Sequence, residues 1–249
     1  MSAKKSNYDL YLERVQSLIK EVQEKERENI FKAAEMIAES LARGELLHVF
    51  GCAHSALLAQ EIFYRTAGLV QLDLISALPL ILIESATDST WFERLEGYAA
   101  RILDKHPITP GEIMLIISTS GRNSVVVEMA LEAKKRGLKV IALTSLAYSN
   151  AVKSRHSSGK KLFELADIVI DNHTIPGDAI IEIKGVSTKV GPTSLVVGSA
   201  ILHALIVRVI EIMVEKGLQP LLWHAANMPG GDEYNTKYIK EYKAKIRHL

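Results

Sequence analysis

Ile113-Met-Leu-Ile-Ile-Ser-Thr-Ser-Gly-Arg-Asn-Ser124 is the stretch of this chain that decides its fold. Its five apolar residues, Ile113–Ile117, predict a strand that is buried on both faces. The small and hydroxylated residues after them predict a tight turn, and the apolar spacing of Val125–Arg136 predicts a helix. A buried strand followed by a short turn and a helix is half of a βαβ unit, so the stretch predicts a parallel sheet covered by helices.

The same pattern recurs on both sides of this stretch. Four more short apolar runs are bounded by turn residues, at Leu46–Phe50, Leu72–Ile75, Val140–Leu143 and Ile168–Ile170, and helical spacing occupies Ala56–Ala67 and Phe92–Leu103. This alternation predicts an α/β fold with three layers, in which helices cover both faces of a doubly wound, five-stranded parallel sheet. Right-handed crossovers then allow the strand order 2-1-3-4-5.

The two ends of the chain add helices to this sheet. Residues 6–43 have helical apolar spacing and predict one long N-terminal helical extension, with a polar stretch at Gln23–Asn29 where we expect a bend. Near the C-terminus the pattern predicts a short extra strand at Ile180–Lys184, a long helix at Ser194–Glu215 and a basic helical tail at 233–249. Because no repeat or linker divides the chain, we expect residues 1–249 to form one domain.

Composition excludes several classes of function. The chain has 30 basic and 29 acidic side chains, so its net charge of +1 gives no field that would attract nucleic acid or a membrane surface. Its single cysteine, Cys52, excludes a disulfide within the chain. The sequence has no signal peptide and no apolar run of about 18 residues. We therefore expect a cytoplasmic protein without a nucleic-acid or membrane partner.

Two serine-containing loops follow the first and third predicted strands, at Gly51–Ser55 and Ser118–Ser124, and each leads into a helix. Helix N-termini and hydroxyl groups suit a phosphate, and Gly121 would let the backbone approach it closely. In the order 2-1-3-4-5 these strands are neighbours at the switch point, where open α/β sheets bind ligands. The alternative is that the serines only cap helices. Two such loops on adjacent strands favour a binding site, in which His54 could also contact the ligand.

These loops resemble those of the SIS (sugar isomerase) domain family, which binds phosphorylated sugars. The second loop and its flanks are similar to the phosphoheptose isomerase branch, and a bacterial group of phosphosugar isomerases shares stretches such as Glu61–Arg65 and Gly230–Asn235. The resemblance implies a flavodoxin-like SIS fold. It also implies that Ser118, Thr119, Ser120 and Ser124 hold the phosphate of a sugar and that Ser55 faces it across the crevice. With His54, Gly121 and Asn123 of the same loops, these are the expected substrate-binding residues. Two departures stand out: Ala53 replaces a usual glycine, and the second loop has an extra residue, with Arg122 expected to face solvent.

An aldose–ketose isomerase needs a base for a carbon-bound proton and a group that polarises the carbonyl oxygen. The candidates are Glu61, Glu84 and His203, although Glu61 could be an exposed helix residue and His203 a core histidine. His203 matches a catalytic histidine of phosphoheptose isomerases. Their metal-binding histidine and glutamine are replaced by Glu61 and Leu195, and their catalytic glutamate by Arg65. We therefore expect no metal and no cofactor, and a reaction unlike theirs.

Two functions remain open on the sequence. The first is an enzyme, a sugar phosphate isomerase or a related lyase or deaminase, with the loop Ser154–Lys160 closing over the sugar or forming a solvated turn. The second is a non-catalytic sensor or scaffold that binds a sugar phosphate. A DNA-binding regulator is disfavoured because the first 45 residues lack the turn of a helix-turn-helix. The resemblance also implies a homodimer or homotetramer with the site near a subunit interface.

Overall fold

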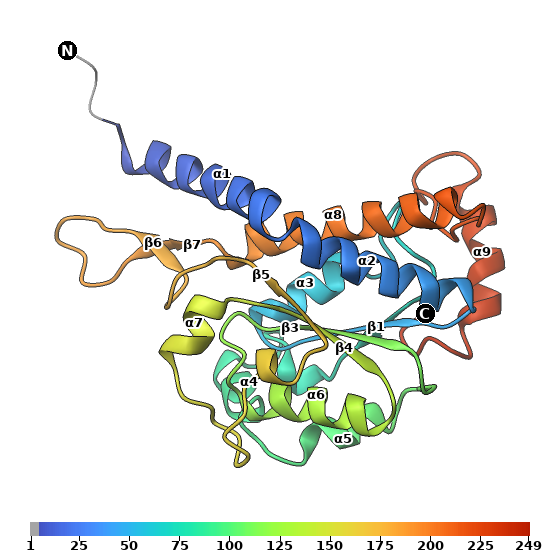
Figure 1. The fold of residues 1–249 in the computed structure, drawn as a ribbon, viewed down its shortest axis with the longest axis horizontal. Helices are drawn as coiled ribbons and strands as arrows, with labels where there is room; N and C mark the ends of the chain where they lie inside the picture. The colour runs from blue at the N-terminus through green and yellow to red at the C-terminus, as the bar shows by residue number, and fades with distance from the viewer. Residues whose placement is uncertain (1–4) are drawn as a thin grey trace.

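A computed structural model describes residues 5–249, in which five parallel strands form one sheet of order β2-β1-β3-β4-β5, as predicted (Figure 1). The strands are β1 (Leu47–Gly51), β2 (Leu72–Ile75), β3 (Ile113–Ile117), β4 (Lys139–Thr144) and β5 (Ile168–Asp171). β1 pairs with β2 on one side and β3 on the other, with Phe50 opposite Ile116. Every residue of β1 and β3 is buried, as expected for strands covered on both faces.

Helices and a hairpin surround the sheet. The helices are α1 (Asn7–Lys25), α2 (Arg27–Ala42), α3 (His54–Ile62), α4 (Ala86–Phe92), α5 (Tyr98–Leu103), α6 (Ser124–Lys135), α7 (Leu146–Ala151), α8 (Ser194–Glu215) and α9 (Gly231–Tyr242), with short 3-10 turns at Leu78–Leu80 and Leu162–Glu164. Strands β6 (Ala179–Ile181) and β7 (Val190–Pro192) pair antiparallel. The predicted helix at Phe92–Leu103 is wrong, because Gly97 adopts a left-handed conformation (φ +83°) and separates α4 from α5.

The helices that follow β1 and β3 cover opposite faces of the sheet. On one face, α2, α3 and α8 bury side chains such as Ile37, Leu58 and Ile201 against Val49 and Leu115. On the other face, α5 and α6 bury Ile102, Val126 and Met129 against Phe50 and Ile116. Because α3 and α6 diverge in this way, a crevice opens between the carboxyl ends of β1 and β3, at the switch point of the sheet.

Helix α8 is the long helix predicted at Ser194–Glu215, and one face of it packs in the core. By length and composition it could cross a membrane, yet 44% of its most apolar window is buried within the protein. Its buried residues include Val197, Leu205 and Val209, which pack against α2 and the sheet. The apolar composition of α8 is therefore explained by its place in the core.

The N-terminal segment is two helices rather than the single long helix predicted. The break falls at Glu26, within the polar stretch where a bend was expected, and the side chain of Glu26 is buried. Its carboxylate accepts hydrogen bonds from the backbone N–H of Asp171 (3.2 Å) and from Asn29 (3.0 Å), and lies 3.0 Å from His173 Nε2. The bend is thus held in place by the end of β5.

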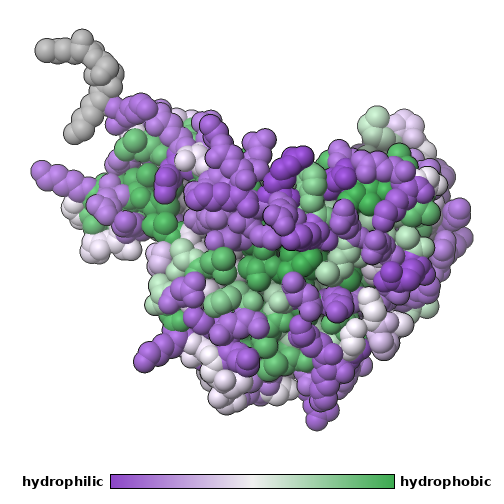
Figure 2. All heavy atoms as spheres, viewed as in Figure 1, coloured by the Kyte–Doolittle hydropathy of each residue, from purple (hydrophilic) through white to green (hydrophobic). Residues whose placement is uncertain are grey.

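Helix α1 and the β6–β7 hairpin project together from the body, and we call them the arm (Figure 1). The hydroxyl of Tyr11 on α1 donates to the carbonyl of Pro192 at 2.9 Å and joins the two parts. Figure 2 shows hydrophobic side chains gathered on the arm. The arm exposes Leu10, Leu12, Val186 and Val190.

A buried polar network lies at the opposite end of the sheet from the crevice, near the start of β1 and β2. His48 Nδ1 lies 3.0 Å from Asp73 Oδ2, and His48 Nε2 lies 2.9 Å from Glu112 Oε2. His106 Nδ1 lies 2.9 Å from the same oxygen of Asp73. These four side chains are almost inaccessible to solvent, so their charges must be compensated by one another.

Candidate functional site

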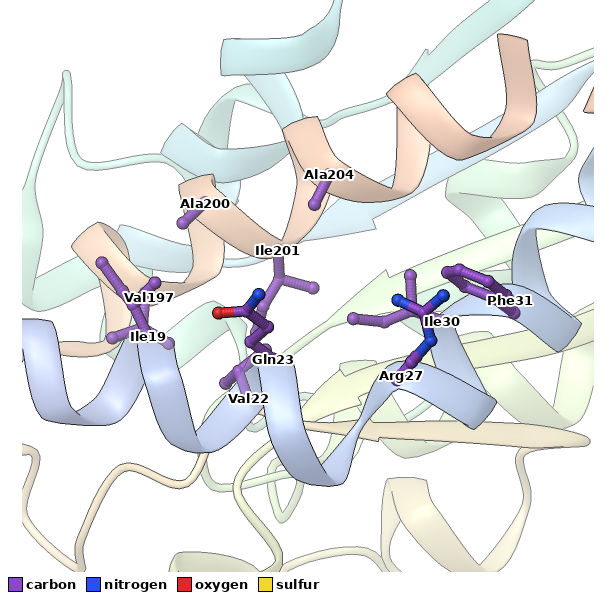
Figure 3. Close-up of a pocket in the computed structure, with 10 residues that line it drawn as sticks. All are labelled: Ile19, Val22, Gln23, Arg27, Ile30, Phe31, Val197, Ala200, Ile201 and Ala204. Carbon is purple, nitrogen blue, oxygen red and sulfur yellow. The ribbon is translucent and has the colours of Figure 1, made fainter. Parts of the chain in front are cut away.

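Two cavities border α8, and the first is apolar. This α1–α8 groove has a volume of about 330 Å³ and runs between α8 and the junction of α1 and α2 (Figure 3). It is lined by Ile19, Val22, Gln23, Arg27, Ile30, Phe31, Val197, Ala200, Ile201 and Ala204. The guanidinium of Arg27 stacks over the ring of Phe31 at 4.3 Å. A surface of this composition suits another apolar surface better than a sugar.

The second cavity is polar and lies at the carboxyl ends of β1 and β3, where the sequence predicted a ligand site. Its volume is about 640 Å³. It is lined by residues of the first loop (Cys52, Ala53, His54, Ser55), the second loop (Ser118, Thr119, Ser120, Arg122, Asn123), three other segments (Glu93, Tyr148, Arg155) and the start of α8 with the hairpin (Gly177, Asp178, Pro192, Ser194, Leu195, Val196). A cavity of this size and polarity can enclose a phosphorylated sugar.

The first loop turns β1 directly into α3. A Cβ at Gly51 would lie 2.5 Å from the backbone oxygen of Ser55, so only glycine permits this tight approach. Ala53 adopts φ +49° and ψ −124°, a conformation typical of glycine, and its N–H donates to the carbonyl of Leu80 at 2.7 Å. The loop therefore holds a glycine-like conformation although an alanine occupies the position.

Replacing Ala53 by glycine is expected to raise the free energy of unfolding by about 1 kcal/mol, because glycine has no Cβ to strain at positive φ. Chemical denaturation of the variant and the wild-type chain measures this difference. A decrease in stability would show that the Ala53 backbone is not strained. Ala56→Gly, in the regular part of α3, is the matched control and should destabilise the protein.

The second loop divides into residues that face the cavity and residues that support the loop. Ser118, Thr119, Ser120 and Asn123 line the cavity, as predicted for binding residues. Two other predicted binding residues do not line it. Gly121 (φ +58°) is buried beside Leu162 and Ser149, and Ser124 donates its hydroxyl hydrogen to the carbonyl of Arg155 at 3.2 Å. Their part in the site is to shape the loop.

Arg122 also lines the cavity, so the expectation that it faces solvent is wrong. Its Nε is buried and has no hydrogen-bond partner within residues 5–249. Arg155 lies next to it: the Arg155 side chain donates to Asn123 Oδ1 at 2.7 Å and its N–H donates to the carbonyl of Arg122. Burial, and then the neighbouring guanidiniums of Arg122 and Arg94, lower the pKa of Arg155. A bound anion would relieve this repulsion.

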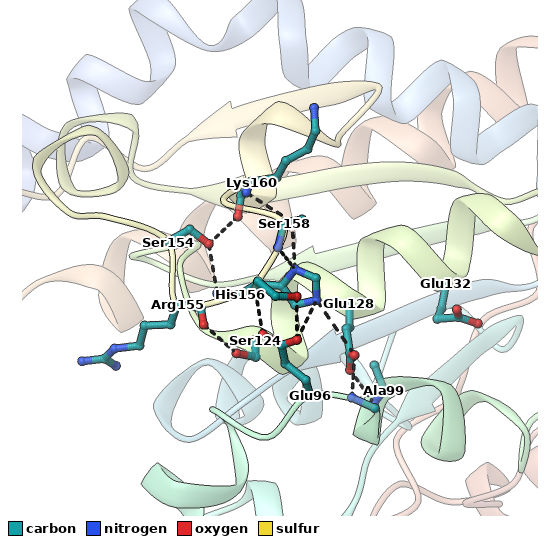
Figure 4. A network of polar contacts seen from close by, with 12 residues as sticks. Glu96, Ala99, Ser124, Glu128, Glu132, Ser154, Arg155, His156, Ser158 and Lys160 are labelled. Carbon is teal, nitrogen blue, oxygen red and sulfur yellow. Dashed lines mark hydrogen bonds and ion pairs between the residues drawn. The ribbon is translucent and has the colours of Figure 1, made fainter.

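Arg155 belongs to the loop at 154–160, which polar contacts hold against α6 and against Glu96 in the segment before α5 (Figure 4). Ser154 donates to the carbonyl of Lys160 at 2.6 Å, and Ser157 donates from both its N–H and its hydroxyl to Glu96, at 2.6 and 2.7 Å. His156 lies between Glu96 and Glu128, about 4 Å from each carboxylate. The loop is therefore fixed by contacts within the chain and brings one residue, Arg155, to the cavity.

Glu93 is a cavity residue that the sequence analysis missed. It lies at the C-terminal end of α4 and its backbone carbonyl accepts the N–H of Val125 at 3.1 Å, which joins it to the start of α6. Burial raises the pKa of its carboxyl group, partly offset by a hydrogen bond from Asn123 and by Arg94 and Arg155. The sequence analysis assigned Phe92–Leu103 to one helix, so Glu93 was not considered for the cavity. Gly97 was the one sequence signal that this helix is broken.

The three predicted catalytic residues lie outside this cavity. Glu61 Oε1 lies 3.3 Å from His203 Nε2 and 3.0 Å from Arg65, where α3 and α8 meet at the surface. Glu84 is exposed in the segment before α4. The structure thus brings Glu61 and His203 together and leaves Glu84 apart. In residues 5–249, no group of three or more potential ligands could hold a metal ion.

Comparison with known proteins shows the family of this chain. The SIS domain model matches residues 10–145, more than half of the chain, and a second SIS domain model matches residues 96–204. This chain belongs to the SIS domain family. Over 238 residues it is 42% identical to the UPF0309 protein of Geobacillus thermodenitrificans, covering 96% of each chain.

Solved structures show the same SIS fold at low sequence identity. Phosphoheptose isomerase GmhA from Neisseria gonorrhoeae matches with a TM-score of 0.55 and 17% identity, over 81% of this chain and 96% of that one. The NanR protein of Vibrio vulnificus, complexed with ManNAc-6P, matches with a TM-score of 0.50 and 13% identity, over 96% of this chain and 70% of that one. The SIS fold therefore occurs both in an enzyme and in a protein whose structure holds a sugar phosphate.

Proposed function

We propose that this SIS protein binds a phosphorylated sugar in the polar cavity and isomerises it between aldose and ketose. The observation that carries the proposal is the composition of the cavity at the switch point. Hydroxyl groups of the two loops and the guanidiniums of Arg122 and Arg155 surround one space, which the carboxylate of Glu93 also lines. The hydroxyls and guanidiniums suit a phosphate, and the carboxylate suits proton transfer.

In this proposal the second loop holds the phosphate. Ser118, Thr119 and Ser120 precede α6, whose N-terminus favours a negative charge. Arg122 supplies charge-assisted hydrogen bonds from the same loop, and Ser55 with His54 contacts the ligand from the first loop. The sugar then extends from the phosphate toward Glu93 and the start of α8.

Proton exchange from solvent into a bound sugar phosphate tests the isomerase directly. The wild-type chain in deuterated buffer is expected to replace one carbon-bound hydrogen, next to the carbonyl carbon, of at least one hexose or amino-sugar phosphate. Proton NMR follows the loss of that signal. Binding of a sugar phosphate without exchange or turnover across the panel would overturn isomerisation and favour the second candidate.

That second candidate is a sugar-phosphate sensor or scaffold without catalysis. Its support is the likeness in fold to NanR, whose solved structure holds ManNAc-6P. The N-terminal helices of this chain weigh against a DNA-binding form of such a sensor, because α2 packs against α8 and the sheet and α1 continues into it through Glu26. Helix α2 is therefore not free to enter a DNA groove.

We further propose that two copies of the chain associate in the cytoplasm through the α1–α8 groove and the arm. The groove is apolar, and the arm next to it exposes Leu12 and Ile19 on α1. Apolar surface of this extent on a soluble protein favours burial in an interface. The surface pair Glu61 and His203 would then reach a ligand only in a cavity that two copies of the chain share. We retain Glu61 and His203 as catalytic candidates for such a shared cavity.

Light scattering is expected to give a mass of about 55 kDa, twice the 27.5 kDa of one chain, or a higher multiple. Replacing Ile19 by glutamate places a charge at the groove and should shift the mass toward 27.5 kDa with unchanged circular dichroism. Glu24→Gln, at an exposed position of α1, is the matched control and should leave the mass unchanged. A wild-type mass of 27.5 kDa would contradict the proposed association.

A further inference from the structure

Two carboxylates line the polar cavity, Asp178 and Glu93, and only one of them is available for chemistry. Asp178 already accepts hydrogen bonds from the N–H groups of Thr193 and Ser194, at 2.9 and 2.8 Å, and from the Ser194 hydroxyl at 2.6 Å. It therefore caps the start of α8, and removing this contact would release the helix end.

Glu93 has a different environment. Its backbone is fixed by the hydrogen bond from Val125, so its side chain starts from a defined position at the edge of the second loop. It is half-buried, lines the cavity beside Asn123 and lies near Cys52, whose side chain is buried. Its carboxylate thus keeps the capacity to accept a proton from a ligand.

Burial raises the pKa of the Glu93 carboxyl group toward the range in which a general base works best. The pKa of its carboxyl group is raised, chiefly by burial, which opposes the lowering by Asn123, Arg94 and Arg155. Carboxylates act best as general bases when their pKa approaches the working pH. The groups that face Glu93 therefore set its pKa: Asn123 and the two guanidiniums stabilise the ionised form, and the surrounding protein destabilises it.

Resting on the proposed isomerase function, we propose that Glu93 is the catalytic base that moves the carbon-bound proton. Its carboxylate takes the proton from the carbon next to the carbonyl group. The electron pair of that C–H bond forms the carbon–carbon double bond of an enediolate. The carbonyl oxygen gains the proton given up by the neighbouring hydroxyl group, whose oxygen keeps the negative charge. Glu93 then returns its proton to the former carbonyl carbon while the charged oxygen forms the new carbonyl group, so the step needs no oxidant, reductant or cofactor.

The position of Glu93 separates the two tasks of the cavity. Arg122, Arg155 and the serines of the second loop hold the phosphate, while Glu93 approaches from the α4 side of the same space. His54 lines the cavity from the first loop and is suited to move the hydroxyl proton between the two oxygens. In this proposal one chain therefore supplies both the residues that bind the phosphate and the base.

The test compares Glu93→Gln with the wild-type chain, using the sugar phosphate that the wild-type chain binds. Glutamine keeps the size of the side chain but cannot take up a proton. We expect binding measured by calorimetry to change less than about tenfold and solvent exchange measured by NMR to fall about 10²–10⁴-fold. Glu241→Gln, on the exposed side of α9, is the matched control and should retain full exchange.

Two outcomes would overturn the role of Glu93. Exchange in Glu93→Gln at the wild-type rate would overturn this assignment while leaving the isomerase function intact. Binding without exchange in the wild-type chain would overturn both the isomerase function and the base. Glu93→Asp separates catalysis from folding, because a shorter carboxylate should recover part of the exchange and shift its dependence on pH, whereas a purely structural loss would recover neither.

Discussion

Replacing Asp73 by asparagine is expected to lower the free energy of unfolding by about 3–5 kcal/mol. Asp73 is fully buried, and its Oδ2 lies 3.0 Å from His48 Nδ1 and 2.9 Å from His106 Nδ1. Burial alone would raise the pKa of Asp73, but the hydrogen bonds with His106 and His48 outweigh it and lower this pKa to about 2. Asparagine would leave a buried, charged His48 with Glu112 as its only acidic partner within residues 5–249.

The same network makes stability depend on pH in a defined direction. Burial alone would lower the pKa of His48, but hydrogen bonds with Asp73 and Glu112 raise it from 6.5 to about 9. The stabilisation from His48 is therefore complete below pH 6.5 and is lost as the pH rises through about 9. The stabilisation from Asp73 is present above pH 3.8 and is lost as the pH falls through about 2.

Urea denaturation at a series of pH values checks both effects. Asp104→Asn is the matched control, because Asp104 forms an exposed ion pair with Arg136 and should contribute far less. The difference in stability between wild-type and Asp73→Asn should be largest between pH 4 and 6.5 and should shrink toward pH 9. A loss no larger than that of Asp104→Asn, or one that does not vary with pH, would contradict a charged network.

Replacing Arg122 by methionine is expected to weaken sugar phosphate binding about 10–100-fold. Its guanidinium faces the cavity, and its buried Nε has no hydrogen-bond partner within residues 5–249. A phosphate would supply charge-assisted hydrogen bonds of about 1.5–3 kcal/mol, which methionine cannot replace. Because the loop is held through the backbone carbonyl of Arg122, the substitution should leave the fold unchanged.

Calorimetric titration of Arg122→Met and of two further variants measures this effect. Arg101→Met removes an exposed guanidinium on α5 and should bind like the wild-type chain. Arg122→Lys keeps the charge without the planar pair of donors and should fall between the two. Equal affinities for wild-type and Arg122→Met would show that Arg122 does not contact the ligand.

The strands and the order of the sheet could be predicted because each depends on local patterns. The runs Leu72–Ile75 and Ile113–Ile117 are observed with the predicted bounds, and the crossover rule gave the strand order. The break at Glu26 was harder to predict from the sequence. Its buried carboxylate is compensated by the backbone N–H of Asp171 and by His173, far away in the sequence, so the sequence indicated a bend and not its cause.

The cavity was predicted in part, because local sequence patterns place some of its residues and distant contacts place the others. Ser55, Ser118 and the residues beside them follow strands directly, so the sheet alone determines where they lie. Glu93 and Arg155 reach the cavity through tertiary contacts, with the start of α6 and with the second loop, which no local pattern encodes. Arg122 was misplaced because an arginine in a loop is usually exposed, whereas here its loop turns inward.

The cavity as a binding site for a phosphorylated sugar is the central claim, and calorimetric titration of the wild-type chain tests it most directly. The panel contains hexose and amino-sugar phosphates together with the same sugars without phosphate. We predict that at least one sugar phosphate binds with one site per chain, and that its unphosphorylated form binds far more weakly. Failure of every sugar phosphate to bind, or equal binding of both forms, would contradict the account.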